Sequence, residues 1–261
     1  MSAAAAAGRT WRVLATALCF AVFGCGALLL SGLWFPLLRV SLRQRVRRVA
    51  AFRRSLACSF RCFLLLCRTV GVFDYRFEGC EALRGERGLI VAANHPTLTD
   101  YVLLASLLPD ADCLVKSELE HNPFLRWVVS AADYLVNDRH ELLLQQAGER
   151  LARGERLLIF PEGTRSVPGR PLRLQRGCAN LALRCGCDIR VVTITCSQSY
   201  LTKHTPWYRI PPQRPHFTVR AGPRLSVAGF ASRHPGLGPA ALSRRLTAAL
   251  AEELAPAAGG G

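Results

Sequence analysis

The sequence predicts an α/β fold, a mixed and mostly parallel sheet flanked by helices, with an N-terminal membrane-associated helical module. Two observations predict it. From residue 75 onward, short apolar runs of strand length alternate with stretches of helical length, a pattern typical of βαβ units. Before residue 75 there is a long uncharged apolar run and then a dense arginine cluster. We therefore divide the chain into a membrane module, residues 1–74, and a catalytic domain, residues 75–261.

The membrane module begins with an apolar run of 26 residues, Val13–Leu38, that contains no charged side chain. A helix needs about 20 apolar residues to span a bilayer, and a secretory signal needs fewer, so the run predicts an uncleaved anchor. A buried or re-entrant hairpin is the alternative. Seven arginines follow within sixteen residues, and under the positive-inside rule they put the catalytic domain on the cytoplasmic face: Arg39, Arg43, Arg45, Arg47, Arg48, Arg53 and Arg54.

The arginine-rich stretch up to residue 73 alternates cationic and apolar residues at roughly helical spacing. This pattern predicts an interfacial amphipathic helix, or a second helix that dips into the membrane, with arginines at anionic headgroups. The net charge of +16 is consistent with any polyanionic partner. No recognition helix and no aromatic RNA-binding platform is apparent, so we expect anionic lipid and not nucleic acid.

The catalytic domain reads as alternating strands and helices from residue 75. Strands are predicted at residues 88–93, 112–116, 133–137, 156–160 and 189–196, and a late strand at 216–222. Helices are predicted at about 99–108, 122–131, 140–153, 176–186 and 238–255. Eleven cysteines are scattered along the chain without a second ligand pair at zinc spacing, so we expect no metal site.

The first candidate motif is "NHPTLTD", residues 94–100, between a strand and a helix. Pro96 disfavours a helical conformation for His95, which predicts that the imidazole projects from a loop. His95 is a candidate general base, and Asp100 is a candidate for the carboxylate that orients it. Thr97 and Asp100 also have capping-box spacing, so the motif alone favours a helix start. No GxSxG segment accompanies it, so an acyl-enzyme mechanism is unsupported.

The second candidate motif is "FPEGTRS", residues 160–166, which follows another predicted strand. Glu162, the flexible Gly163, Thr164 and Arg165 make a polar turn. Backbone N–H groups and a guanidinium at such a turn suit a phosphate. A plain surface turn fits this stretch alone, but its occurrence with the histidine motif favours a catalytic interpretation.

The two motifs at this separation resemble those of the glycerolphosphate and lysophospholipid acyltransferase family, over residues 75–225. "LVKSEL" (114–119) and "YLVNDR" (134–139) are similar to two intermediate blocks of that family. The resemblance implies that His95 is the base, that Lys116, Arg139 and Arg165 gather the acceptor phosphate, and that Glu162 helps to hold the loop. It implies acyl-CoA or an acyl carrier protein as co-substrate, no cofactor, a lipid acceptor, and a location at the bacterial inner membrane.

The acceptor is the open part of this interpretation. The resemblance favours 1-acylglycerol-3-phosphate. The fourth block, "IRVVTITC" (189–196), lacks the prolines usual in the family, and residues 199–217 look like a subgroup associated with aryl-polyene lipids. An aryl-polyene, amino-acid lipid or lipid A type acceptor is therefore the alternative. A non-catalytic basic protein that binds anionic lipid or nucleic acid would leave the paired motifs unexplained.

Overall fold

The computed structural model describes residues 3–118, 126–137 and 140–255, and their strands form one seven-stranded sheet. The strands are β1 (Asp74–Glu78), β2 (Ile90–Ala93), β3 (Ala111–Lys116), β4 (Leu135–Asn137), β5 (Arg156–Ile159), β6 (Ile189–Cys196) and β7 (His216–Leu225). Their order is β1-β7-β6-β2-β5-β3-β4, and every neighbouring pair is parallel except β6 with β7. The predicted mixed, mostly parallel sheet is confirmed.

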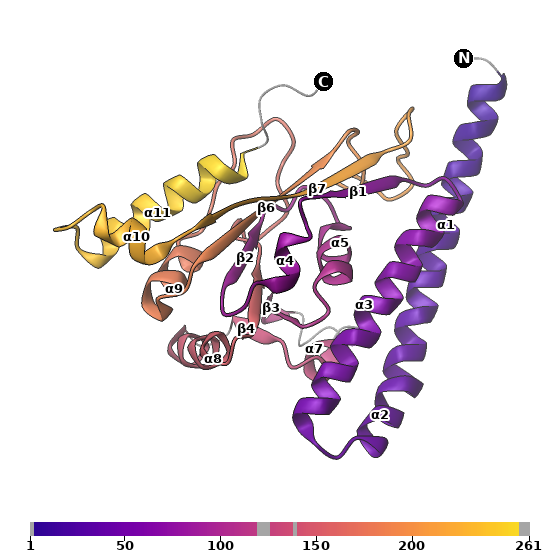
Figure 1. Cartoon of the computed structure of the whole chain (residues 1–261). Helices are drawn as coiled ribbons and strands as arrows, with labels where there is room; N and C mark the ends of the chain where they lie inside the picture. The colour runs from indigo at the N-terminus through magenta and orange to yellow at the C-terminus, as the bar shows by residue number, and fades with distance from the viewer. Residues whose placement is uncertain (1–2, 119–125, 138–139, 256–261) are drawn as a thin grey trace.

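The chain starts with a long helical hairpin that stands along one side of the sheet (Figure 1). Its first arm is α1 (Ala3–Leu29), a short π-helical turn η1 (Leu30–Trp34) and α2 (Phe35–Ser41), and its second arm is α3 (Arg45–Thr69). The remaining helices are α4 (Ala82–Gly85), α5 (Asp100–Leu107), α7 (Arg126–Ala131), α8 (His140–Ala152), α9 (Gly177–Cys185), α10 (Val227–Ser232) and α11 (Pro239–Leu254).

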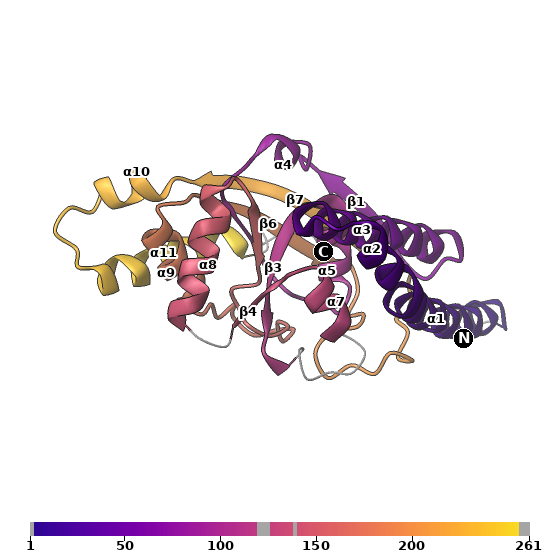
Figure 2. The same ribbon diagram turned by 90° about the horizontal axis from the view of Figure 1, so that it is seen from below.

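Two hydrophobic cores lie on the two faces of the sheet (Figure 2). One core joins the hairpin to α5 through side chains such as Phe52, Phe60 and Leu103. The other joins α8, α9 and α11 through side chains such as Ala147 and Leu246. The second arm of the hairpin is thus part of the catalytic core, because α3 packs on α5 and covers one face of the sheet.

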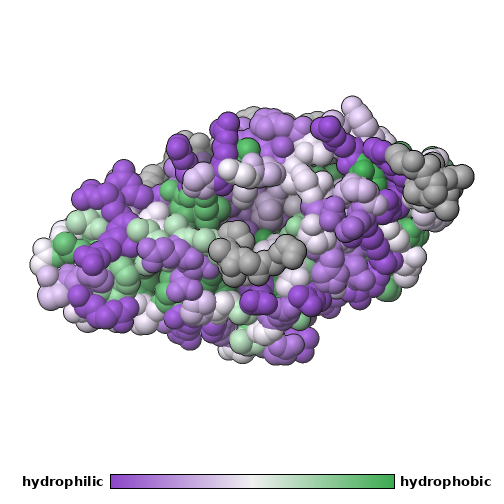
Figure 3. All heavy atoms as spheres, turned by 90° about the horizontal axis from the view of Figure 1, so that it is seen from above, coloured by the Kyte–Doolittle hydropathy of each residue, from purple (hydrophilic) through white to green (hydrophobic). Residues whose placement is uncertain are grey.

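The central strands β2 and β5 are buried along their whole length because helices cover both of their faces. They are parallel neighbours, with Ile90 opposite Leu157 and Ala92 opposite Ile159. The loops that leave their carboxyl ends therefore emerge side by side, at the edge where α/β sheets usually bind ligands. The surface of the molecule seen from above is hollowed near its centre in the space-filling view (Figure 3).

The apolar run predicted at residues 13–38 lies within the first arm of the hairpin. Residues Gly8–Ser41 form a helix long and apolar enough to cross a membrane by length and composition, and only 17% of its most apolar window is buried in the protein. Trp11, Leu14, Leu18, Leu33 and Leu37 are among its exposed side chains.

Candidate active site

His95 and Asp100 stand together at the carboxyl end of β2. Asn94 fastens this strand end to β6, because its side chain accepts from the backbone N–H of Ile194 and donates to the same residue's carbonyl. His95 follows in the loop, and its Nδ1 lies 2.8 Å from Oδ2 of Asp100, the first residue of α5. A carboxylate at Nδ1 favours the tautomer with its proton there, which leaves Nε2 free to accept a proton.

The Asp100 carboxylate also accepts two hydrogen bonds from Thr97, one from its backbone N–H at 2.6 Å and one from its hydroxyl at 2.5 Å. The two interpretations of the motif are therefore compatible, since one carboxylate binds the turn and the imidazole together. Thr97 is not the cap itself: α5 begins at Asp100, and its N-cap, Thr99, makes no side-chain cap bond.

Asp100 is fully buried, whereas the imidazole of His95 is 21% exposed. Burial raises the pKa of the Asp100 carboxyl, and the hydrogen bonds from His95 and Thr97 act in the opposite direction. Phe160 stacks on the imidazole, with ring centroids 4.4 Å apart. The ring is thus held on one edge by a carboxylate and on one face by an aromatic side chain.

The second motif is bonded directly to the first. The carboxylate of Glu162 accepts from the backbone N–H of His95 at 2.7 Å and from the Ser166 hydroxyl at 2.7 Å. The Ser166 backbone N–H donates to the His95 carbonyl, also at 2.7 Å. Glu162 is buried, so its carboxylate binds the two loops to each other. Gly163 has a φ of +67°, a left-handed conformation that favours glycine, and this lets the turn bring the glutamate inward.

The predicted phosphate-binding residues do not form one cluster. Arg165 lies beside this turn, where its guanidinium Nη1 donates to the carbonyls of Leu201 and Thr202 at 3.1 and 3.2 Å. Lys116 is exposed at the end of β3 and does not line the pocket beside the turn. Arg139 lies outside the described residues. Thr164 is exposed and lines the pocket beside Arg165.

Comparisons with known proteins indicate what the chain is similar to. The family model named Acyltransferase matches residues 74–197, which include both motifs and the strands that carry them. A 1-acyl-sn-glycerol-3-phosphate acyltransferase of Pseudomonas aeruginosa is 27% identical over 207 residues, covering 76% of this chain and 75% of that protein. Residues 74–197 belong to the acyltransferase family.

Two further similarities bear on this acyltransferase. A lyso-ornithine lipid O-acyltransferase of Pseudomonas aeruginosa is 36% identical over 128 residues, which is 47% of this chain and 48% of that protein. The crystal structure of PlsC, the 1-acyl-sn-glycerophosphate acyltransferase of Thermotoga maritima, has the same fold, with a TM-score of 0.63 at 20% identity. That match covers 95% of this chain and 98% of the other.

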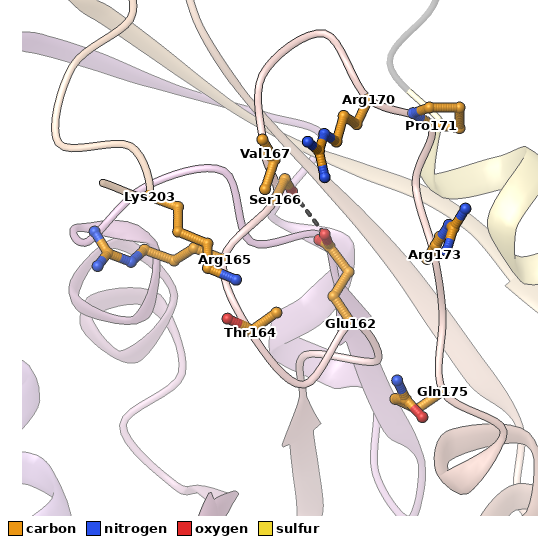
Figure 4. A pocket seen from close by; sticks show the side chains of 10 residues that line it. All are labelled: Glu162, Thr164, Arg165, Ser166, Val167, Arg170, Pro171, Arg173, Gln175 and Lys203. Carbon is orange, nitrogen blue, oxygen red and sulfur yellow. Dashed lines mark hydrogen bonds between the residues drawn. The ribbon is translucent and has the colours of Figure 1, made fainter. Parts of the chain in front are cut away.

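A pocket of about 350 Å³ in this acyltransferase opens beside the Glu162 turn (Figure 4). Four cationic side chains line it against one acidic side chain, Glu162: Arg165, Arg170, Arg173 and Lys203. In the close-up, Arg170 and Arg173 lie on one side of Glu162, and Arg165 and Lys203 lie on the other side (Figure 4).

The motif-based interpretation missed the last three of these cations. The available signal was the recurrence of arginine after the motif, at residues 165, 170, 173 and 176. Ser166 connects this pocket to a neighbouring cavity of about 250 Å³, because it lines both of them. Pro96, Thr97 and Thr202 also line that second cavity. Within the described residues, no three His, Cys, Asp or Glu side chains gather to hold a metal ion.

Proposed function

We propose that this acyltransferase moves a fatty acyl group from an acyl thioester, acyl-CoA or an acyl carrier protein, to the hydroxyl of 1-acylglycerol-3-phosphate. The observation that carries the proposal is the 2.8 Å contact between His95 Nδ1 and the buried Asp100, together with the Glu162 bond to the His95 backbone. A histidine held on two sides in this way keeps its free nitrogen in a fixed direction.

In the proposed reaction, His95 Nε2 removes the proton from the acceptor hydroxyl as its oxygen attacks the thioester carbonyl. The tetrahedral species then collapses, the carbon–sulfur bond breaks, and the departing thiolate takes the proton back from His95. Asp100 stabilises the imidazolium that exists between these two proton transfers. No covalent acyl-enzyme is formed, which agrees with the absence of a GxSxG segment from the sequence.

The cationic pocket supports a phosphate-bearing acceptor. Arg165, Arg170, Arg173 and Lys203 together face one carboxylate, so the pocket favours a dianionic headgroup. Ser166 lines this pocket and its backbone N–H donates to the His95 carbonyl, so the pocket adjoins the loop that carries the base. Arg170, Arg173 and Lys203 are thus added to Arg165, the cation in this pocket that the sequence motifs indicate.

The test of the base is His95→Ala in the purified full-length protein, assayed with lysophosphatidic acid and an acyl thioester. We expect the turnover number to fall about 10²–10⁴-fold, the range usual for loss of a general base. His234→Gln, at the end of α10, is the matched control and should keep full activity. Acyl transfer by His95→Ala at the rate of the unchanged protein would remove His95 from the role.

A lyso-ornithine lipid is the second candidate acceptor, because the relative named for it has the higher identity over its shorter match. An ornithine headgroup carries no phosphate, so the two acceptors differ in their need for the cationic pocket.

We expect Arg170→Gln/Arg173→Gln to raise the KM for lysophosphatidic acid about tenfold or more, since hydrogen bonds to charged groups contribute about 1.5–3 kcal/mol each. An unchanged KM for lysophosphatidic acid, with efficient use of lyso-ornithine lipid, would favour the second acceptor.

We also propose that the hairpin lies along the surface of the membrane, on the cytoplasmic face of the bacterial inner membrane, and does not cross it. Polar contacts tie the hairpin to the catalytic domain at both ends: Arg12 donates to the Pro212 carbonyl, and Arg45 pairs with Asp133. A spanning helix would put Arg12 and Arg45 on opposite faces of the bilayer, and the catalytic domain, which contacts both, would then have to lie in the hydrocarbon between them.

Protease protection of tags at the two termini tests this arrangement in sealed inner-membrane vesicles. A hairpin in the membrane plane leaves both tags on the same side, whereas a single crossing separates them. Tags with opposite accessibility would restore the spanning anchor.

A further inference from the structure

The connection between β6 and β7 contains a stretch, residues 199–212, that we name the bridging loop. It contacts α1 at three points. The Tyr200 hydroxyl lies 3.5 Å from that of Thr16, the Pro212 carbonyl accepts from Arg12 at 2.7 Å, and the Trp207 ring lies 5.9 Å from that of Phe20. These contacts extend over more than two turns of α1, so the loop is packed along the middle of this helix.

The bridging loop also contacts both catalytic motifs. The Leu201 carbonyl accepts from the Leu98 backbone N–H at 3.0 Å and from the Arg165 guanidinium at 3.1 Å. Thr202 lines the cavity beside Pro96 and Thr97. One loop therefore contacts the helix with the most exposed apolar surface and also the residues around the proposed base.

The outer side of the bridging loop combines exposed aromatic rings with cations. Trp207 is 43% exposed and Tyr208 is 60% exposed, although both are large apolar side chains. The exposed Arg209 and Arg214 follow them in the sequence, and residues 198–214 contain no Asp or Glu. Tryptophan and tyrosine concentrate at the headgroup level of bilayers, and cationic side chains next to them attract anionic lipid.

We propose that the bridging loop is a second membrane-contacting element, with Trp207 and Tyr208 seated among the headgroups of an anionic bilayer beside α1. This inference rests on the proposed function in one respect, since the acceptor is taken to be a membrane lipid. An acidic carrier protein would account for the cations. It would leave unexplained why the exposed rings adjoin Phe20 on the helix that exposes Trp11, Leu14 and Leu18.

A consequence for the reaction follows from the bonds of Leu201. Leu98 is half exposed and belongs to the loop that carries His95, so the mouth of the site lies next to the bridging loop. A loop held at the headgroup level keeps this mouth at the lipid surface. An amphiphilic acceptor can then reach the base with its acyl chain still in the bilayer.

The test uses tryptophan fluorescence of the full-length protein bound to vesicles that contain brominated phosphatidylglycerol. One variant keeps only Trp207 (Trp11→Phe/Trp34→Phe/Trp127→Phe). The matched control carries a single tryptophan at the far edge of the molecule, through Leu237→Trp with all four native tryptophans changed to phenylalanine. We expect bromine to quench Trp207 and shift its emission to the blue, and to leave the Leu237→Trp emission unchanged.

A second measurement separates docking from a structural role. We expect Trp207→Ser/Tyr208→Ser to raise the KM for an acceptor embedded in vesicles and to leave turnover of detergent-dispersed acceptor unaltered. Loss of activity in both assays would assign the rings to the fold and overturn the proposal. Unquenched Trp207 in vesicle-bound protein, or protection of Trp207 only by acyl carrier protein, would overturn it as well. Quenching needs no substrate, so it remains decisive even if lysophosphatidic acid is not the acceptor.

Discussion

Asp100 has the hydrogen bonds on which the proposed base depends, since one carboxylate binds the His95 imidazole and both the backbone and the hydroxyl of Thr97. We expect Asp100→Asn to lower the turnover number about 10²–10⁴-fold, because an amide neither stabilises imidazolium nor enforces the same tautomer. Kinetics of the purified protein measure this, with circular dichroism as the check on folding. An asparagine variant with more than a tenth of the original turnover would contradict the role.

The pH dependence follows from the same carboxylate. Burial raises the pKa of Asp100, and the Thr97 hydroxyl opposes this by donating to the ionised form. Removing that donor by Thr97→Val must raise the pKa further. Because the base needs the ionised carboxylate, the acid limb of kcat/KM should move to higher pH. A profile of kcat/KM between pH 5 and 8 checks the sign, and a shift to lower pH would refute it.

The dyad was predictable only because the second motif accompanies the first, since the spacing of Thr97 and Asp100 alone favours a helix start. The hydrogen bond between the His95 backbone and Glu162 was not predictable from the sequence. The two residues lie 67 positions apart, and only the pairing of β2 with β5 brings them together. Lys203 was missed for the same reason, because it shares no motif with Arg165 and lies near it only in the folded chain.

At the scale of the elements, α3 separates arginines that the sequence presents as one cluster. Arg53 points inward, 6% exposed, where it donates to the Ala132 carbonyl and pairs with Asp112 and Glu155 at 3.4 and 3.3 Å. Its neighbour Arg54 is exposed. The helical period allows either residue to face the core, and only the position of the buried Asp112 decides between them.

The difference in burial between Arg53 and Arg54 predicts that substitution by methionine lowers the free energy of unfolding by unequal amounts at the two positions. We expect Arg53→Met to lower the free energy of unfolding by about 3–5 kcal/mol, since it leaves part of a buried ion-pair network uncompensated. Arg54→Met should change it by less than about 0.5 kcal/mol, as is usual for surface positions. Denaturant unfolding of the full-length protein in detergent measures both. Equal losses in the two variants would contradict the inward role of Arg53.

The strands β2 and β5 were predictable because both of their faces are buried, so their sequences contain the short apolar runs "IVAA" and "LLI". The first strand, β1, was missed, since "DYRFE" lies at the edge of the sheet, is half-buried apart from the exposed Arg76, and has no apolar run. Its pairing with β7, from Asp74 opposite His216 to Glu78 opposite Arg220, joins segments about 140 residues apart. Only the assembled sheet supplies that partner.

At the scale of the whole molecule, positive charge is concentrated at one side. Residues 1–73 hold eleven of the 34 Lys and Arg and none of the 18 Asp and Glu, so this segment supplies +11 of the net +16. Because that segment forms the hairpin, the charge lies along one edge of the fold, opposite α10 and α11 (Figure 1). Such an asymmetry orients a protein toward an anionic surface, and net charge alone does not.

Two matched triple variants separate the effect of the uneven charge distribution on membrane binding from the effect of the net charge. Arg39→Gln/Arg43→Gln/Arg47→Gln removes three charges from the hairpin edge, and Arg233→Gln/Arg244→Gln/Arg245→Gln removes three from the opposite edge. Each arginine near an anionic leaflet contributes about 1 kcal/mol, so the first triple should weaken binding to phosphatidylglycerol vesicles roughly 10²-fold. The second should change it little, because screening confines the attraction to about 10 Å at 0.1 M salt. Equal losses in co-sedimentation would mean that net charge, and not the hairpin edge, governs the attraction to the membrane.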